Sequence, residues 1–263
     1  MNASFKLGIV GGAGWLGGAI AGAALSAGVV RAEDLTLSYR SAKPGRFSGA
    51  FLTDDNQALA DRSDVIMLSV RPQDWPSLGL DATGKLVISV MAGIRMAEIG
   101  EKHGTSRVAR TLPNAAAEVA KSYTPWIASS DATEADRAIL RAIFDACGVQ
   151  DEVATERDID YLTGLTGSGP AFPALLADAM MRDAIAFGLS ADVARRAVNT
   201  VLAGTGRLLE LNDTSPADTV EAFLGYRGTT AAAIETMREA GFDEAVAKGL
   251  AAALLKSIAM GKA

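Results

Sequence analysis

Short runs of consecutive apolar residues alternate with longer mixed stretches over the first half of the chain. Val65–Val70 (VIMLSV) is bounded by Asp64 and by Arg71-Pro72, as expected of a strand buried on both faces of a sheet. Similar runs predict further strands at Lys6–Val10, Leu35–Tyr39, Ala50–Leu52, Leu86–Val90 and Arg107–Thr111. Because helical stretches such as Ala19–Ala27 separate the strands, we expect right-handed crossovers and a parallel sheet.

The pattern changes after about residue 155, where helical spacing replaces the strand-like runs and no further strand is predicted. Helices are predicted at Thr133–Cys147, Ala171–Phe187, Ala191–Leu211 and Phe242–Met260. The apolar stripe of Ala191–Leu211 is wider than an isolated helix needs, which predicts packing against another subunit. An α/β half followed by a helix-only half predicts two domains, residues 1–155 and 156–263.

Composition and charge narrow the class of protein. Apolar residues make up 49% of the chain, which excludes wholesale disorder, and the net charge of −6 gives no electrostatic reason to bind nucleic acid or an anionic membrane. No apolar run is long enough to cross a bilayer and the N-terminus lacks the features of a signal peptide, so we expect a cytoplasmic protein. Cys147 is the only cysteine in the sequence, which excludes a disulfide scaffold and a thiolate metal site. His103 is the only histidine, which excludes any mechanism that needs two histidines. No metal is expected. His103, before Gly104, is predicted to be a cation at a helix end.

A glycine motif follows the first predicted strand and opens a helix. It fits G-x-G-x-x-G and consists of Gly12, Ala13, Gly14, Trp15, Leu16 and Gly17. The glycines permit a tight turn, a close approach of the backbone to a pyrophosphate, and close packing of helix on strand. The amide groups at the helix N-terminus then hold the phosphates. This context predicts a dinucleotide site, whereas a turn without a ligand is the alternative.

The end of the second predicted strand indicates which dinucleotide is bound. An acidic residue there would accept the ribose hydroxyl of NAD(H), but the sequence Ser38-Tyr39-Arg40-Ser41-Ala42-Lys43 has none. A guanidinium with a neighbouring hydroxyl and ammonium suits a 2′-phosphate, so Arg40 and Ser41 favour NADP(H). Ordinary solvated loop charges are the alternative.

Two further segments lie at the carboxyl ends of predicted strands, where open parallel sheets bind ligands. We expect both to border the nicotinamide half of the cofactor, and ordinary turns without a ligand are the alternative. They are Ser69-Val70-Arg71-Pro72 and Met91-Ala92-Gly93.

Several local patterns together resemble the pyrroline-5-carboxylate reductase family over nearly the whole chain. The most specific is Thr163–Phe172 (TGLTGSGPAF), followed by the glycine-threonine loop Gly228-Thr229-Thr230. The remaining matches are Asn56, Asp64–Pro72 with Arg71 where a lysine is usual, Arg110-Thr111-Leu112-Pro113-Asn114, Glu156 and Asp160.

The resemblance implies an α/β fold with an N-terminal Rossmann dinucleotide-binding domain and an all-helical dimerisation domain. It implies a homodimer or higher homo-oligomer that reduces 1-pyrroline-5-carboxylate to proline, with hydride passing from NADPH to the imine carbon. Asn56 and Asn114 would contact the cofactor. Thr230 would hydrogen-bond the substrate's ring nitrogen or carboxylate, the backbone of Gly228–Thr230 would hold the carboxylate, and Glu156 would line the pocket.

The substrate loop departs from the family pattern. Gly225-Tyr226-Arg227-Gly228 stands where the family usually has Ser-Pro-Gly-Gly, and Asn114 is followed by three alanines and Glu118. We hypothesise that Arg227 pairs with an anionic group of the substrate, either the usual carboxylate or a second acid on a different imine. An ion pair between Arg227 and an acidic residue across the dimer is the alternative. Two alternative functions stay open: reduction of a different carboxylated imine, and NADP binding without catalysis. A β-hydroxyacid dehydrogenase is disfavoured, because no lysine occurs between Gly164 and Asn199.

Overall fold

The structure, a computed structural model, describes residues 5–40, 45–211 and 214–261. The chain forms two compact units. The sheet unit comprises the residues up to Ser168 together with those from Ala252 onward, and the helical unit comprises Gly169–Ala251. The domain boundary expected after residue 155 stays a prediction.

Eight strands form one sheet in the described part of the sheet unit, in the order β3-β2-β1-β4-β5-β6-β7-β8. The strands are β1 (Leu7–Val10), β2 (Leu35–Ser38), β3 (Phe51–Thr53), β4 (Val65–Leu68), β5 (Leu86–Ser89), β6 (Val108–Thr111), β7 (Ser122–Ala128) and β8 (Gly148–Glu152). The strands from β3 to β6 pair in parallel, as predicted. β7 pairs antiparallel with β6 and parallel with β8, so the sheet is mixed, and the prediction of a parallel sheet was wrong at this edge.

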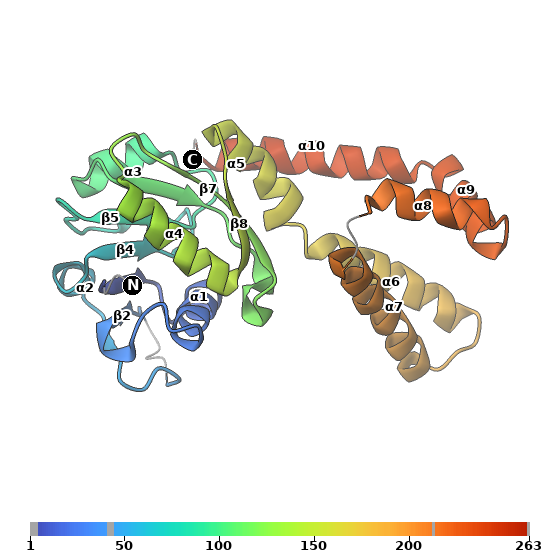
Figure 1. The fold of residues 1–263 in the computed structure, drawn as a ribbon, viewed down its shortest axis with the longest axis horizontal. Coiled ribbons are helices and arrows are strands. Elements are labelled where there is room, and N and C mark those ends of the chain that lie inside the picture. Colours follow the sequence, from blue (N-terminus) through green and yellow to red (C-terminus); the bar gives the residue numbers. More distant parts are fainter. Residues whose placement is uncertain (1–4, 41–44, 212–213, 262–263) are drawn as a thin grey trace. The chain divides into compact units, whose positions relative to one another are not determined.

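Helices cover both faces of this sheet (Figure 1). The helices α1 (Trp15–Ser26) and α4 (Glu134–Cys147) pack on one face, and α2 (Asn56–Asp61) and α3 (Met96–His103) on the other. Successive side chains of a strand point to opposite faces. In β4 two side chains therefore enter the core under α1 and α4 and the other two enter the core under α2 and α3, which explains its continuous apolar run.

α4 begins with a capping box. Thr133 and Asp136 exchange hydrogen bonds with each other's backbone amides. The buried Asp136 carboxylate also accepts a hydrogen bond from Arg107 Nε at 2.9 Å. The cap thus ties the start of α4 to the start of β6.

His103 ends α3 ahead of Gly104, as expected of a helix end, but it is not the predicted cation. The ring is 1% exposed. Trp75 Nε1 donates to its Nε2 at 3.3 Å, and its Nδ1 lies 3.1 Å from the Leu80 carbonyl oxygen. Burial lowers the pKa of His103, so the imidazole is neutral at pH 7.

The helical unit is built from the helices predicted for it and two shorter ones, and no strand occurs among its described residues. Its helices are α6 (Ala171–Ala186), α7 (Ala191–Leu211), α8 (Pro216–Gly225), α9 (Thr229–Glu239) and the first part of α10 (Phe242–Met260). α5 (Glu156–Leu162) and the last turns of α10 belong to the sheet unit.

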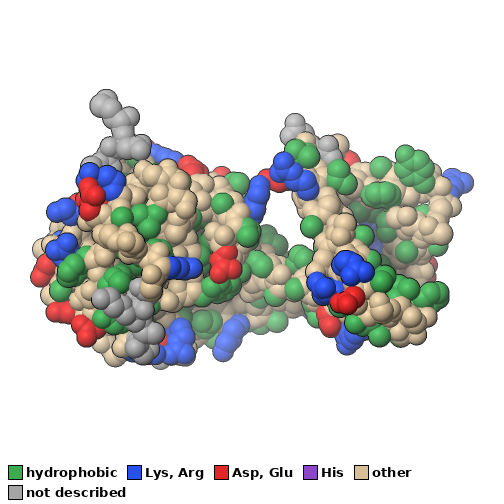
Figure 2. Space-filling view, turned by 90° about the horizontal axis from the view of Figure 1, so that it is seen from below, with side chains coloured by type: hydrophobic (Ala, Val, Ile, Leu, Met, Phe, Trp, Pro, Cys, Tyr) green, Lys and Arg blue, Asp and Glu red, His purple; other side chains and the backbone are tan. Residues whose placement is uncertain are grey.

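The helical unit buries very little of its apolar surface by itself. Among its described side chains only Ala194, Val198 and Ala231 are buried apolar residues. Large side chains are instead exposed along α6 and α7, including Leu175 at 67% and Leu208 at 61%. Figure 2 shows hydrophobic side chains over the surface of this unit, on the right of the view. A helical array with so little core needs a further surface against which to pack.

Candidate functional site

The glycine-rich loop between β1 and α1 brings three backbone segments into close contact. Gly11 has a φ of +76°, and a Cβ on it would lie 2.4 Å from the carbonyl oxygen of Ser69. A Cβ on Gly17 would lie 2.9 Å from the Gly11 carbonyl oxygen. Side chains at these positions would force the loop apart, so both residues must be glycine. The predicted motif began at Gly12, but the tight turn begins one residue earlier.

The N-terminal end of α1 is built for an anion. The N-cap residue Gly14 places no side chain over the first amides, and no acidic residue lies in the first turn. Unpaired amide groups and the positive end of the helix dipole therefore face the loop. A phosphate group fits this cradle.

A cavity of about 710 Å³ adjoins this loop at the carboxyl ends of β1, β2 and β4. Seven of the residues predicted for cofactor binding line it: Ala13, Gly14, Arg40, Asn56, Ser69, Val70 and Arg71. The glycine cradle, this position at the strand ends and the two cationic side chains fit a phosphorylated dinucleotide.

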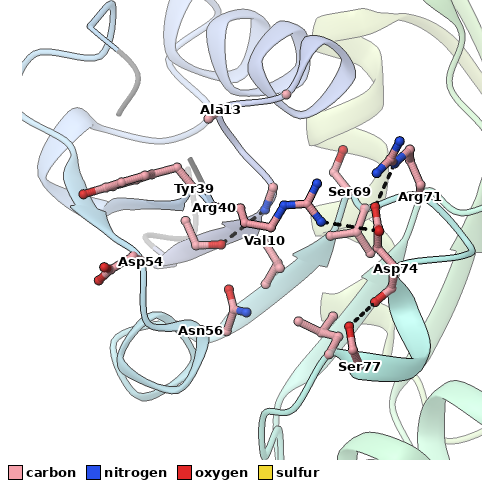
Figure 3. A pocket seen from close by; sticks show the side chains of 15 residues that line it. Val10, Ala13, Tyr39, Arg40, Asp54, Asn56, Ser69, Arg71, Asp74 and Ser77 are labelled. Atoms are coloured by element: carbon pink, nitrogen blue, oxygen red, sulfur yellow. Dashed lines mark hydrogen bonds and ion pairs between the residues drawn. The ribbon is translucent and has the colours of Figure 1, made fainter. Parts of the chain in front are cut away.

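The cavity wall also holds charged residues that the sequence analysis did not select, Asp54 and Asp74. Asp74 lies between the two cations, as Figure 3 shows. Arg71 Nε donates to Asp74 Oδ2 at 2.7 Å, and Arg40 Nη1 reaches Asp74 Oδ1 at 3.4 Å. The hydrogen bond from Arg71 holds the pKa of Asp74 below its usual range, so the carboxylate is ionised at pH 7. The i,i+3 spacing of Arg71 and Asp74 could have predicted their ion pair from the sequence. The contact between Arg40 and Asp74 had no such signal.

Other predicted cofactor residues lie outside the cavity lining. Gly12, Trp15, Leu16 and Gly17 belong to the loop and the start of α1, Pro72 follows Arg71, and Ser41 lies outside the described residues. The Trp15 side chain is 60% exposed, and its indole N–H donates to Glu118. Its acceptor, Glu118, belongs to the segment after Asn114 that departs from the family pattern.

The segments after β5 and β6 have their own local partners. Ala92 and Gly93 follow β5, and the last turn of α10 packs on Gly93, with the Gly261 nitrogen 2.7 Å from where a Cβ on Gly93 would be. Asn114 is 8% exposed; its Oδ1 accepts from the Ala116 amide and its Nδ2 donates to the Thr166 carbonyl. The Asn114 side chain thus holds the backbone in place.

Glu156 belongs to a cluster of two guanidinium and two carboxylate groups in the sheet unit, which we call the ion-pair quartet: Arg95, Arg110, Glu156 and Asp160. Arg110 donates to Glu156 at 2.9 Å and to Asp160 at 3.1 Å, and Arg95 donates to Asp160 at 2.7 Å. Glu156 Oε1 also accepts from the Met96 amide at 3.0 Å, which caps the start of α3. The quartet fixes α5 to β6 and to the segment that follows Gly93.

The predicted substrate residues lie in the helical unit, at the turn between α8 and α9. Gly228 is the N-cap of α9, and Thr229 and Thr230 are its first two residues. Arg227 has a φ of +50°, a conformation that favours glycine. The family pattern has glycine at this position, a residue that adopts such a φ without strain. The roles proposed for Thr230, Glu156 and Arg227 stay predictions.

The described residues offer neither a cluster of metal ligands nor a membrane-spanning helix. No group of three or more His, Cys, Asp or Glu side chains among them could hold a metal ion. None of the described helices is long and apolar enough to cross a membrane.

Two family models match the chain. Residues 156–260 match the model for pyrroline-5-carboxylate reductase dimerisation, and residues 6–93 match that for coenzyme F420-dependent NADP oxidoreductases. A pyrroline-5-carboxylate reductase of Synechocystis sp. is 34% identical over 217 residues, 80% of each chain. That of Vibrio alginolyticus is 31% identical over 81% of each, and that of Glycine max is 28% identical over 97% of this chain and 95% of its own.

Solved structures agree in fold. A pyrroline carboxylate reductase of Plasmodium falciparum with NADP bound has a TM-score of 0.84 at 24% identity, with 98% of each chain covered. A pyrroline-5-carboxylate reductase of Coxiella burnetii has a TM-score of 0.87 at 23% identity, with 99% of this chain and 100% of that chain covered. The predicted fold class, a Rossmann-like α/β half followed by a helical half, is confirmed.

Proposed function

The chain belongs to the pyrroline-5-carboxylate reductase family, and we propose that it reduces 1-pyrroline-5-carboxylate to proline with NADPH as the hydride donor. The observation that carries the proposal is the family membership over four-fifths of the chain, and the cavity beside the glycine loop at the strand ends supports it. The P. falciparum relative was solved with NADP bound, and the sequence of β2 favours the same cofactor here.

The sheet unit supplies the cofactor site in this proposal. The amides at the start of α1 hold the pyrophosphate, and Arg40 pairs with the 2′-phosphate. Asn56, Ser69 and Val70 line the cavity beside it. NADPH, when bound there, would supply the hydride that the imine carbon accepts, and the imine nitrogen must also be protonated for the amine to form. The expected absence of a metal stays a prediction, as does a cytoplasmic location.

The start of α9 supplies the substrate contacts. The amides of Thr229 and Thr230 carry no side-chain cap and suit the substrate's carboxylate. The Thr230 hydroxyl is proposed to hydrogen-bond the ring nitrogen or the carboxylate, which positions the substrate. Glu156 is proposed to line the pocket with its carboxylate fixed by Arg110. Orientation of the imine is the main contribution of the protein, because hydride transfer itself needs no nucleophile.

The helical unit is proposed to complete itself in a homo-oligomer. Its exposed apolar side chains on α6 and α7 need a partner surface, and the matching family model is a dimerisation domain. A light-scattering mass at micromolar protein is expected to give a dimer or a multiple of it. A sharp monomer mass would contradict the proposal.

NADPH oxidation by the purified protein tests the reaction. We expect rapid turnover of 1-pyrroline-5-carboxylate and slower turnover of carboxylated six-membered imines. Turnover of another carboxylated imine alone would favour the first alternative, and NADPH binding without turnover of any imine would favour a non-catalytic homologue. Thr230→Val, which keeps the shape of the side chain and removes the hydroxyl, is expected to lower the rate without changing NADPH affinity.

Arg227 is the residue through which the altered loop is proposed to act on the substrate. If its guanidinium pairs with an anionic group, Arg227→Gly raises the KM for the imino acid by about tenfold, because a charge-assisted hydrogen bond is lost. Arg227→Lys keeps most of the effect of the charge. Glycine also suits the φ of +50°, so the change in KM cannot come from a strained backbone. A KM that stays the same in both variants for every imino acid tested would refute the pairing.

A further inference from the structure

The cofactor cavity contains a carboxylate where an anionic ligand is expected to find only cations. Among the residues that the structure describes, the charged ones that line it are Arg40, Arg71, Asp54 and Asp74, and the formal charges of these four cancel. A dinucleotide with a 2′-phosphate is a polyanion, and every carboxylate near its phosphates opposes binding. Asp74 is the carboxylate that contacts the cations, whereas Asp54 lies apart from them on the far side of the cavity (Figure 3).

The two guanidinium groups hold Asp74 unequally. Arg71 and Asp74 lie in one turn, in which the Asp74 amide also donates to the Arg71 carbonyl at 2.9 Å, and the side chains meet at 2.7 Å. Arg40 comes from the end of β2, its side chain is 77% exposed, and its contact is a single one of 3.4 Å. A contact of that length and exposure is worth little, so Arg40 is free to exchange one anion for another.

Arg40 is also the cation that the sequence following β2 assigns to the 2′-phosphate. Figure 3 shows its side chain extending across the cavity from β2 toward Asp74. Its contact with Asp74 and a contact with a 2′-phosphate use the same donor group. NADH has a hydroxyl in place of the 2′-phosphate. Arg40 therefore adds little to the affinity for NADH, and competition from Asp74 lowers that affinity little.

We propose that Asp74 is a specificity-determining residue of the cofactor site: its carboxylate competes with the 2′-phosphate of NADP(H) for Arg40 and thereby reduces the preference for NADPH over NADH. The inference rests on the proposed NADPH-dependent function. If Asp74 only held the site together, removal of its charge would weaken cofactor binding. In this proposal, removal of its charge strengthens binding of the phosphorylated cofactor.

Asp74→Asn tests the inference in equilibrium binding of NADPH and NADH to the full-length protein, without an imine. The asparagine keeps an acceptor for Arg71 and removes the charge. A unit charge a few ångströms from another is worth on the order of 1 kcal/mol in water, so we expect the Kd of NADPH to fall by about fivefold. The Kd of NADH is expected to stay within about twofold, since that ligand has no 2′-phosphate to compete with Asp74 for Arg40.

Arg31 and Asp34 provide a matched control. They form the same i,i+3 ion pair, at 2.6 Å, but neither lines the cavity. Asp34→Asn changes the net charge equally and is expected to leave both Kd values unchanged. In an Arg40→Ala background, Asp74→Asn is expected to change the NADPH to NADH ratio by less than about twofold, because the contested cation is gone.

The outcomes separate the inference from the function on which it rests. An NADPH to NADH affinity ratio that falls or stays constant in Asp74→Asn overturns the inference, as does an equal gain for both cofactors. Binding does not require turnover, so intact NADPH binding with no reduction of any imine overturns the proposed function alone. A wild-type protein that bound neither cofactor would overturn both.

Discussion

Replacement of Arg110 by methionine is expected to destabilise the sheet unit strongly. Arg110 is 1% exposed and donates to Glu156 and to Asp160, and Asp160 is 2% exposed. Methionine fills much of the same volume and leaves no donor. Asp160 would then keep only the contact with Arg95 at 2.7 Å, from a side chain that is 38% exposed.

The loss in the free energy of unfolding depends on how poorly the Asp160 carboxylate is paired once Arg110 is gone. Removal of one partner of a buried ion pair costs about 3–5 kcal/mol, because the remaining charge stays in a poorly solvated site. Arg95 still neutralises part of Asp160, so we expect a loss at the lower end, about 3 kcal/mol. Arg95→Met removes the exposed cation of the same quartet and is expected to cost only about 1 kcal/mol.

Urea unfolding at a fixed protein concentration measures both variants, with the slope of the transition checked for constancy. Arg110→Met combined with Asp160→Asn removes the stranded charge and is expected to recover about 1 kcal/mol relative to Arg110→Met alone. If Arg110→Met cost no more than Arg95→Met, the quartet would not be a buried electrostatic unit, and the reasoning would be refuted.

Three further predictions follow from single side chains. Burial alone would raise the pKa of Asp136, but the hydrogen bonds from Arg107 and from the helix cap outweigh burial and lower the pKa. The ionised Asp136 therefore stabilises the folded protein above about pH 4, and this contribution is lost as the pH falls through the pKa of the folded state. Acid unfolding curves of Asp136→Asn are therefore expected to be shallower than those of the wild type, and parallel curves would contradict this. Burial raises the pKa of the Cys147 thiol to about 12, so a thiol reagent at neutral pH should modify the native protein far more slowly than the unfolded chain; equal rates would count against burial. Trp15→Phe is expected to abolish most of the tryptophan fluorescence change on NADPH addition, because the other two tryptophans are buried; an undiminished change would place the cofactor away from α1.

The fold was predictable where burial dictates the residue pattern. β4 is enclosed by helices on both faces, and its sequence is accordingly apolar throughout. The edge strand β8 (GVQDE) is largely exposed and polar, so it has no apolar signal. β7 contains Pro125, which ordinarily argues against a strand in a sheet. These two strands were therefore missed, and with them the change of strand direction after β6.

The site was predictable to the extent that its chemistry is local in sequence. The glycine loop and Arg40 follow from strand ends and spacing. The contact between Arg40 and Asp74 instead joins residues 34 positions apart and depends on the placement of β2 and β4 on either side of β1. The hydrogen-bond partners of Glu156 were likewise not predictable from the sequence. The family pattern indicates the residue, but its partners on β6 and α3 depend on how the sheet is assembled.

The return of α10 to the sheet unit determines how the protein can be dissected. The chain leaves that unit after Ser168 and re-enters it at Ala252, so no single peptide bond separates the two units. A fragment that stops at Ser168 would lack the turn that packs on Gly93. Two fragments produced by one cut within the helical unit would each retain a piece of the sheet unit, which makes the chain suited to reconstitution from split halves.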